Sequence, residues 1–273
     1  KSQYPHLVRQ LSSAKSPQQM FGAAMKTYFA KSIDADPNDI CTVSIMPCLA
    51  KKGEQNMELF YEEYAGHDID IVLTTRELTR MIRATHIEPT TLQDVPCDEL
   101  MRDASGAGVI FGATGGVMEA ALRTSYFLIT GKNPDADAFH AVRRTREDEF
   151  TMTAEIPIGD LVVKTAIVSG LRNARRLIER MERGEAHYDF VEVMACPGGC
   201  VGGGGQPIHD SEELALTRSQ NLYFLDASNE LRFCHENPDI QKLYQDFMEA
   251  PLSHKAHMLL HTDHNIWEMP KRK

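Results

Sequence analysis

Short runs of β-branched and apolar residues alternate along the chain with longer stretches in which apolar residues recur every three or four positions. The short runs predict strands and the longer stretches predict amphipathic helices, so the pattern is typical of an α/β fold. Strands are expected at residues 41–46, 70–73, 106–111, 161–168 and 190–194. Helices are expected over residues 17–32, after Thr75, through 118–122, over 171–182, and in much of the chain from Ser211 onward.

Local signals refine three of these elements. Ser16 followed by Pro17 predicts a capped helix start, and the apolar spacing predicts a buried face made of Met20, Phe21, Ala24, Met25 and Tyr28. The run Asp-Ala-Ser-Asn at residues 226–229 predicts a turn, because these polar residues favour one. The basic run Arg-Arg-Thr-Arg at residues 143–146 and the basic face of the helix at 171–182 predict exposed surface.

Composition narrows the class of protein. The chain has 273 residues, 42% of them apolar and 25% charged, which suits one large core or two packed lobes. A formal net charge of -10 argues against a nucleic-acid partner, because phosphate binding needs a basic surface. We expect no membrane-spanning segment and no signal peptide, since no apolar run is long enough. A cytoplasmic location is the expectation, and a periplasmic one stays open.

Six cysteines provide the candidate chemistry. In a chain of this length they predict free thiols in a reducing compartment and not a disulfide scaffold. Cys48 and Cys196 each follow a predicted strand, where sites lie in open α/β sheets, and Cys200 follows Cys196 after Pro-Gly-Gly. The remaining cysteines are expected to be small buried side chains; they are Cys41, Cys97 and Cys234.

Thiolates are ligands for zinc and for iron–sulfur clusters. The glycine-rich segment at residues 196–205 favours a cluster, because its backbone can turn tightly and present N–H donors to sulfide. Lys51, three residues after Cys48, needs an anionic partner if it is buried, and an anionic metal ligand would be one. A zinc site made of Cys48, Cys196, Cys200 and a histidine stays open, although the chain has no paired Cys-x-x-Cys motif.

Four segments resemble the [FeFe]-hydrogenases. They are residues 11–19 (Leu-Ser-Ser-Ala-Lys-Ser-Pro-Gln-Gln), 46–54 (Met-Pro-Cys-Leu-Ala-Lys-Lys-Gly-Glu), 111–120 (Phe-Gly-Ala-Thr-Gly-Gly-Val-Met-Glu-Ala) and 192–207 around both later cysteines. The resemblance extends from near the first residue to about His261. It implies an α/β fold of two lobes, with mostly parallel sheets flanked by helices and a cluster site in the cleft between the lobes. Residues 1–273 would then be the H-cluster domain, without a ferredoxin-like domain.

The resemblance also implies a cofactor and roles for individual residues. The H-cluster is a [4Fe-4S] cubane joined to a two-iron subcluster that carries CO, cyanide and a bridging azadithiolate. Cys48, Cys196 and Cys200 match cubane ligands, and Cys200 matches the sulfur shared with the two irons. Lys51 matches a donor to cyanide and Ser12 a member of the proton relay. The other matching positions near the cluster are Gln18, Met46, Glu54, Phe111 and Met194.

One family signature, Thr-Ser-Cys-Cys-Pro, normally precedes the Leu-Ser-Ser-Ala-Lys motif and does not occur in this chain. In the family it supplies a fourth cubane ligand and a proton-transferring cysteine. We expect the chain to be an N-terminally incomplete part of a longer protein, and the alternative is that another polypeptide completes the site. The expected activity is reversible H2 oxidation and proton reduction, with ferredoxin or another electron-carrier subunit as partner. Three alternatives stay open: a hydrogenase-like iron–sulfur assembly factor, an H2-sensing hydrogenase and a zinc-binding interaction module.

Overall fold

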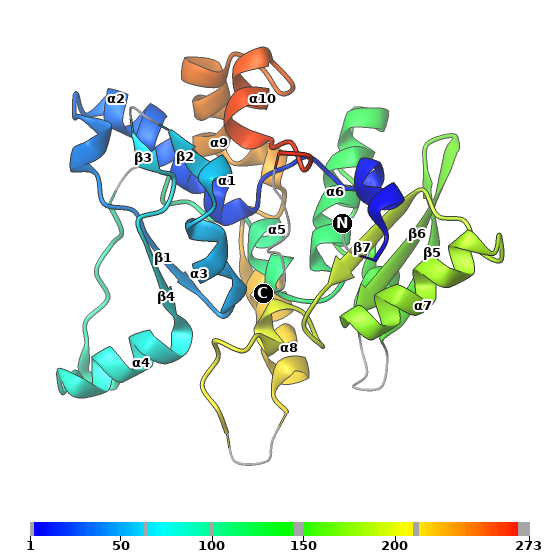
Figure 1. The fold of residues 1–273 in the computed structure, drawn as a ribbon, viewed down its shortest axis with the longest axis horizontal. Helices are drawn as coiled ribbons and strands as arrows, with labels where there is room; N and C mark the ends of the chain where they lie inside the picture. The colour runs from blue at the N-terminus through cyan, green and yellow to red at the C-terminus, as the bar shows by residue number, and fades with distance from the viewer. Residues whose placement is uncertain (1–2, 63–64, 99–100, 145–149, 210–212, 267–273) are drawn as a thin grey trace. The chain divides into compact units, whose positions relative to one another are not determined.

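The computed structural model describes residues 3–62, 65–98, 101–144, 150–209 and 213–266. By their internal contacts the residues form two compact units. Unit 1 comprises Lys1–Thr74 together with Lys242–Lys273, and unit 2 comprises Thr75–Gln241. Figure 1 labels the helices and strands of both. The candidate site residues are divided between the units, so each unit is described by itself.

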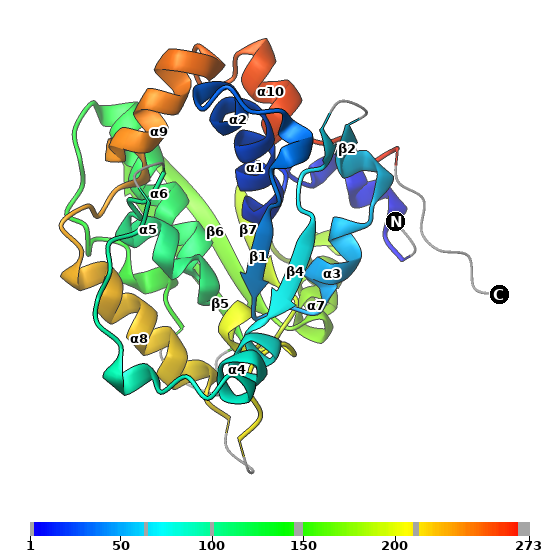
Figure 2. The same cartoon turned by 90° about the vertical axis from the view of Figure 1, so that its left-hand side faces the viewer.

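Unit 1 is built on a pair of short parallel strands. β1 (Val43–Met46) lies beside β4 (Ile71–Thr74), with Met46 opposite Thr74 at the carboxyl ends. Figure 2 shows the two strands side by side, with α3 (Ala50–Gln55) next to β4. The antiparallel pair β2 (Tyr61–Glu62) and β3 (Gly66–His67) stands apart from them. Helix α1 (Pro17–Ala24) contacts α10 (His254–Leu260), which comes from the far end of the chain.

The helix expected at residues 17–32 is confirmed as α1, a π-helical turn (Met25–Phe29) and α2 (Ala30–Ser32). Ser16 caps it as predicted, because its Oγ accepts a hydrogen bond from the Gln19 N–H at 3.4 Å. Tyr28 is buried and its ring lies 5.7 Å from that of Phe247. The prediction that Phe21 is buried was wrong: this side chain is 47% exposed, because it lines an open apolar cavity of about 520 Å³.

Unit 2 contains a three-stranded sheet with helices on both faces. The strands are β5 (Thr151–Ile158), β6 (Leu161–Ser169) and β7 (Phe190–Met194), in that order. α6 (Gly116–Thr130) covers one face and α7 (Leu171–Glu182) the other. Alternate β6 residues serve the two faces, since Ile167 joins the α6 cluster whereas Ala166 and Val168 join the α7 cluster. This alternation follows from the two-residue period of a strand.

The remaining helices are α4 (Thr75–Ala84), α5 (Gly106–Val109), α8 (Ala215–Ser228) and α9 (Pro238–Leu243). The strand expected at residues 106–111 was wrong, because this segment forms α5 and a 3-10 turn (Ile110–Gly112). Ser105 Oγ caps α5 by accepting from the Gly108 N–H at 3.2 Å. Gly106 allows the close approach of Asp226, whose carboxylate oxygen lies 2.1 Å from where a Cβ would stand. Ser105 and Asp226 therefore hold this short run of small residues in a helical conformation and not in an extended one.

The α/β class is confirmed, but the sheets are less parallel than expected. Of the four strand pairings in the described ranges, β1–β4 and β6–β7 are parallel, and β2–β3 and β5–β6 are antiparallel. The β5–β6 pairing is antiparallel because only Gly159 and Asp160 connect the two strands, and Gly159 has φ +59°. So short a connection forms a hairpin and cannot make the crossover that parallel strands require.

A buried ionic network braces α6 in unit 2. The side chains of Glu119, Arg123 and Asp226 are fully buried, and Arg123 contacts the two carboxylates at 2.7 and 2.8 Å. Arg143 joins Glu119 at 2.6 Å, and Arg232 joins Asp226 at 2.9 Å. Removing one member of such a network costs about 3–5 kcal/mol, because an opposite charge stays buried without compensation.

The network overturns two expectations. Residues 226–228 belong to α8 and do not form a turn, because Asp226 is held by Arg123 and Arg232. The basic run is not exposed surface where the structure describes it: the Arg143 side chain is 15% exposed and Arg144 is buried. Thr145 and Arg146 lie outside the described residues.

In the ranges that the structure describes, no helix combines the length and the hydropathy that crossing a membrane requires.

Candidate functional site

Cys196 and Cys200 lie just beyond the carboxyl end of β7, in a segment that we call the cysteine turn (residues 196–203). The Gly199 N–H donates to the Cys196 carbonyl at 3.1 Å, and the Gly203 N–H donates to the Cys200 carbonyl at 2.9 Å. The Cys196 side chain is partly exposed and Cys200 is exposed, and neither is in a disulfide. Two consecutive tight turns therefore present two thiols at one strand end, where the sequence predicted a site.

The cysteine turn packs against a second turn (residues 111–116), which we call the facing turn. Gly199 has φ +95°, and a Cβ there would stand 2.7 Å from the Thr114 nitrogen and 2.8 Å from the Gly112 oxygen. The Thr114 N–H also donates to the Gly198 carbonyl at 3.3 Å. Glycine is required at residue 199 for both reasons. The backbone that Gly199 approaches is that of the facing turn.

Glu192, four residues before Cys196, fixes the facing turn from β7. Its two carboxylate oxygens accept hydrogen bonds from the N–H groups of Gly115 and Met118, both at 2.7 Å. These donors are at the N-terminus of α6, whose N-cap is Gly115 and so has no capping side chain. Glu192 supplies the missing cap from another element and places a negative charge at the positive end of the helix. Burial raises the pKa of Glu192, and the two main-chain hydrogen bonds oppose that rise.

Ser169, at the end of β6, holds the cysteine turn from the sheet. Its buried Oγ accepts a hydrogen bond from the Gly198 N–H at 2.7 Å. The sequence analysis assigned no role to Ser169 and cited Glu192 only as the start of a motif. The available signal was a polar residue at an inward position of an apolar strand, which needs a buried partner. Its partner, far along the chain, could not be read from the sequence.

Two further predicted residues belong to the same region of unit 2. Met194 is the last residue of β7, two positions before Cys196, and is 9% exposed. Phe111 is in the 3-10 turn that begins the facing turn and is partly exposed. Unit 2 therefore brings four of the predicted residues together at the end of β7 and on the two adjoining turns; these are Met194, Cys196, Cys200 and Phe111.

Unit 1 places the predicted residues other than Ser12 in or near β1 and α3. Cys48 follows β1 and is partly exposed. Lys51 forms an ion pair with Glu54 within α3, and Ser16 donates a hydrogen bond to the same carboxylate. Glu54 is thus the anionic partner of Lys51 in this structure, and the side chains of both are about one-fifth exposed.

Gln18 connects this group to β1. Its Oε1 accepts from Ser44 Oγ at 2.7 Å, and its Nε2 donates to the Lys51 carbonyl at 3.5 Å. Met46 ends β1 beside Thr74, as described above. Ser12 is exposed, and its Oγ accepts from the Ala14 N–H at 3.2 Å.

The cysteines that the sequence predicted as buried differ from that expectation. Cys41 lies before β1 and is exposed, and Cys97 is also exposed. Cys234 is partly buried, and its sulfur lies 3.5 Å from Ser105 Oγ. Burial raises the pKa of the Cys234 thiol, which keeps it protonated and poorly suited to bind metal. The buried role is therefore wrong for Cys41 and Cys97.

The next question is whether the side chains that could bind metal fit an iron–sulfur cluster held by cysteines. Within the described ranges no group of three or more His, Cys, Asp or Glu side chains is placed to hold a metal ion by itself. Unit 2 offers two thiols on a turn fixed by Glu192 and Ser169, and unit 1 offers Cys48. Thiols on glycine-rich turns fit an iron–sulfur group. The convergence of all three sulfurs on one group stays a prediction.

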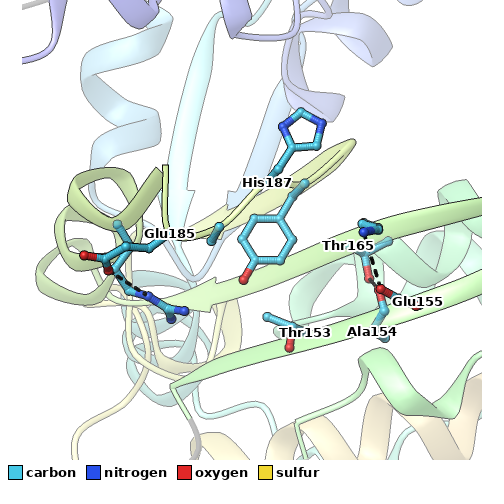
Figure 3. A pocket seen from close by; sticks show the side chains of 10 residues that line it. Thr153, Ala154, Glu155, Thr165, Glu185 and His187 are labelled. Atoms are coloured by element: carbon cyan, nitrogen blue, oxygen red, sulfur yellow. Dashed lines mark hydrogen bonds and ion pairs between the residues drawn. The ribbon is translucent and has the colours of Figure 1, made fainter. Parts of the chain in front are cut away.

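The hollow shown in Figure 3 is a different place. It has a volume of about 270 Å³ and is lined by polar residues of β5, β6 and the segment before β7, among them Thr165 and Tyr188. Thr165 lies opposite the start of β7, whereas the cysteine turn follows its end. The hollow holds two long ion pairs, Lys164–Glu155 at 3.6 Å and Arg180–Glu185 at 3.9 Å, and no cysteine lines it.

Two family models match the chain. A model described as iron only hydrogenase large subunit, C-terminal domain, matches residues 1–204, and a model described as iron hydrogenase small subunit matches residues 212–266. The chain is 44% identical over 261 residues to a subunit of an NADP-reducing hydrogenase from Solidesulfovibrio fructosivorans, covering 95% of this chain and 44% of that protein. It is 33% identical over 267 residues to cytosolic iron-sulfur assembly component 3 of Mus musculus, covering 95% and 55%.

The chain spans about half the length of the curated relatives it matches. Among solved structures, it resembles an apo [FeFe]-hydrogenase variant from Chlamydomonas reinhardtii with a TM-score of 0.79 and 38% identity, covering 95% of this chain and 71% of that one. This likeness confirms the predicted class, a mixed α/β fold with helices flanking its sheets.

Proposed function

Because the chain belongs to the family of iron-only hydrogenase large subunits, we propose that it is the catalytic part of an enzyme that interconverts dihydrogen, protons and electrons. The observation that carries this proposal is the braced cysteine turn. Glu192 and Ser169 fix, from two strands, the main chain around Cys196 and Cys200. Ligands held by such a supporting shell keep the spacing that a metal group requires.

We assign Cys48, Cys196 and Cys200 as ligands of a [4Fe-4S] cubane, with Cys200 shared with a two-iron subcluster carrying CO, cyanide and a bridging azadithiolate. When bound, this group supplies an electron store and the metal at which dihydrogen is split or formed. The proposal leaves a fourth cubane ligand and a proton-transferring cysteine to a segment other than this one. It also requires an electron carrier, such as ferredoxin or a redox subunit.

The residues of the chain have four tasks in this proposal. Met46, Met194 and Phe111 provide apolar walls that exclude water from the reacting group. Lys51 keeps a positive charge near Cys48, with Glu54 as its partner until an anionic ligand such as cyanide replaces it.

Gln18 holds the main chain of Lys51 in place through its 3.5 Å hydrogen bond. Ser12 is assigned to the proton relay, because its hydroxyl is exposed and can both accept and donate a proton at Oγ.

An iron–sulfur assembly factor is the second candidate, because relatives named for that role match nearly the whole chain. Their identity is 33–34%, against 44% and 40% for the hydrogenases above and from Clostridium pasteurianum. An H2-sensing hydrogenase would hold the same group, so it differs only in its partner. The proposal for the catalytic enzyme therefore depends on the bound group and on turnover.

The test is the Cys200→Ser variant, with Cys97→Ser as a matched control because Cys97 is exposed and has no assigned role. Each variant is produced anaerobically with its maturation factors, within the longer protein that supplies the fourth cubane ligand and the proton-transferring cysteine. Iron, CO and cyanide infrared bands and H2 turnover are then measured. We expect wild type and control to show all three and Cys200→Ser to lose the bands and turnover. Wild-type turnover in Cys200→Ser contradicts the assignment. Iron without these bands in the wild type indicates the assembly factor, and zinc indicates an interaction module.

A further inference from the structure

The hydroxyl of Thr114 is a buried polar group without a protein partner. Thr114 is 1% exposed, and its Oγ1 forms no hydrogen bond with any residue that the structure describes. A buried hydroxyl normally has a partner, since leaving it unpaired costs free energy. Such an unpaired group in a well-packed region indicates that something else provides the partner.

Thr114 lies directly against the turn that carries the two thiols. Its N–H donates to Gly198, and its nitrogen is the backbone atom nearest to where a Gly199 Cβ would stand, at 2.7 Å. Its carbonyl accepts from Tyr223 Oη at 3.5 Å. Both main-chain polar groups of Thr114 are therefore paired, and only the side chain is left to interact with a bound group.

We infer that Thr114 is a positioning and tuning residue whose hydroxyl donates a hydrogen bond to sulfur of the iron–sulfur group held by Cys196 and Cys200. This inference rests on the proposed function. Cluster sulfides and cysteine thiolates accept hydrogen bonds, and they accept them more strongly when an added electron increases their negative charge. The hydroxyl therefore stabilises the reduced state and raises the reduction potential of the group.

The test compares Thr114→Val, which keeps the shape and removes the hydroxyl, with Thr114→Ser, which keeps the hydroxyl. A control is Thr165→Val in the same unit: Thr165 is also fully buried, but its hydroxyl already donates to the Ala154 carbonyl at 3.0 Å. The cluster is reconstituted in the longer protein that supplies the fourth cubane ligand, and its reduction potential is measured by an anaerobic redox titration followed by electron paramagnetic resonance. Urea unfolding of the cluster-free proteins is measured in parallel.

We expect Thr114→Val to lower the potential by an amount of the order of a tenfold change in the equilibrium between oxidised and reduced cluster, about 59 mV for one electron. Thr114→Ser is expected to stay near the wild-type potential. Without the cluster, Thr114→Val should be at least as stable as the wild type, because it removes an unpaired hydroxyl. Thr165→Val should lose stability and keep the wild-type potential.

Three results would overturn the inference. The first is an unchanged potential in Thr114→Val with a normal cluster content, which leaves the proposed function intact. The second is a loss of stability in cluster-free Thr114→Val as large as that of Thr165→Val, because the hydroxyl would then have a protein partner. The third is a wild-type protein that binds no iron–sulfur group, which removes the proposed function as well.

Discussion

Replacing Glu192 tests whether the cap that it provides from β7 stabilises unit 2 and its cysteine turn. The carboxylate accepts two buried hydrogen bonds of 2.7 Å from the N-terminus of α6, where Gly115 offers no side chain. Glu192→Ala leaves both N–H groups without an acceptor. Each buried donor left unpaired costs about 1–3 kcal/mol, so we expect a loss of roughly 2–6 kcal/mol of unfolding free energy. Domains are stable by only about 5–15 kcal/mol in total, so this loss is large.

Glu192→Gln is the finer variant. The amide keeps one acceptor oxygen, but its NH2 group faces the other N–H donor, so we expect a loss of about 1–3 kcal/mol. The control is Glu155→Gln on β5, whose side chain is 68% exposed and forms only a 3.6 Å ion pair with Lys164. A change at such a surface position stays within about 0.5 kcal/mol.

Urea unfolding followed by circular dichroism measures these losses, and the pH dependence adds a second criterion. Because burial raises the folded-state pKa of Glu192, ionising this side chain costs more in the folded state than in the unfolded state. The unfolding free energy should therefore fall as the pH rises from the unfolded-state pKa through the folded-state pKa, and above that the two hydrogen bonds that the carboxylate accepts remain. Glu192→Gln should remove that part of the pH dependence. Losses in both Glu192 variants no larger than in Glu155→Gln would refute the capping role.

Two further predictions concern Gly199 and Asp137. Gly199→Ala should lower the unfolding midpoint and the iron content together, because a Cβ at φ +95° would meet the Thr114 backbone at 2.7 Å; unchanged values for both would contradict the close approach. Burial of the Asp137 carboxylate raises its pKa, but the hydrogen bonds and charges of His140 and Arg232 outweigh burial and lower the pKa of Asp137 to about 2. Asp137 should therefore stabilise the fold above its unfolded-state pKa and lose that effect as the pH falls through about 2, and Asp137→Asn should flatten acid denaturation there.

The sequence pattern predicted a helix or strand correctly where the conformation of that element depends on its own residues. The apolar spacing over residues 17–32 and the Ser16 cap predicted a helix that the structure contains, because both signals act within a few residues. The β-branched run at 190–194 likewise gave β7. Residues 106–111 failed for the opposite reason: their conformation depends on Ser105 and on the distant Asp226, and not on their own apolar character.

Burial was the property that the sequence predicted least well. Arg143 and Arg144 read as surface residues, yet Arg143 pairs with Glu119, 24 positions earlier. Phe21 and Cys41 read as core residues, yet both are exposed along the open face near β1. Residue type indicates how costly burial would be, but only the packing of distant segments decides whether a partner is present to compensate it.

The sequence by itself determined the α/β class, the family resemblance and the placement of thiols at the ends of strands, because these follow from short-range periodicity and contiguous motifs. The tertiary structure alone decided how the cysteine turn is held. Glu192 reaches Gly115 and Met118 across 77 and 74 residues, and Arg123 reaches Asp226 across 103. Such pairings form only when folding brings distant segments together. A buried donor, carboxylate or guanidinium needs a partner, and that partner can come from any part of the chain that packs beside it.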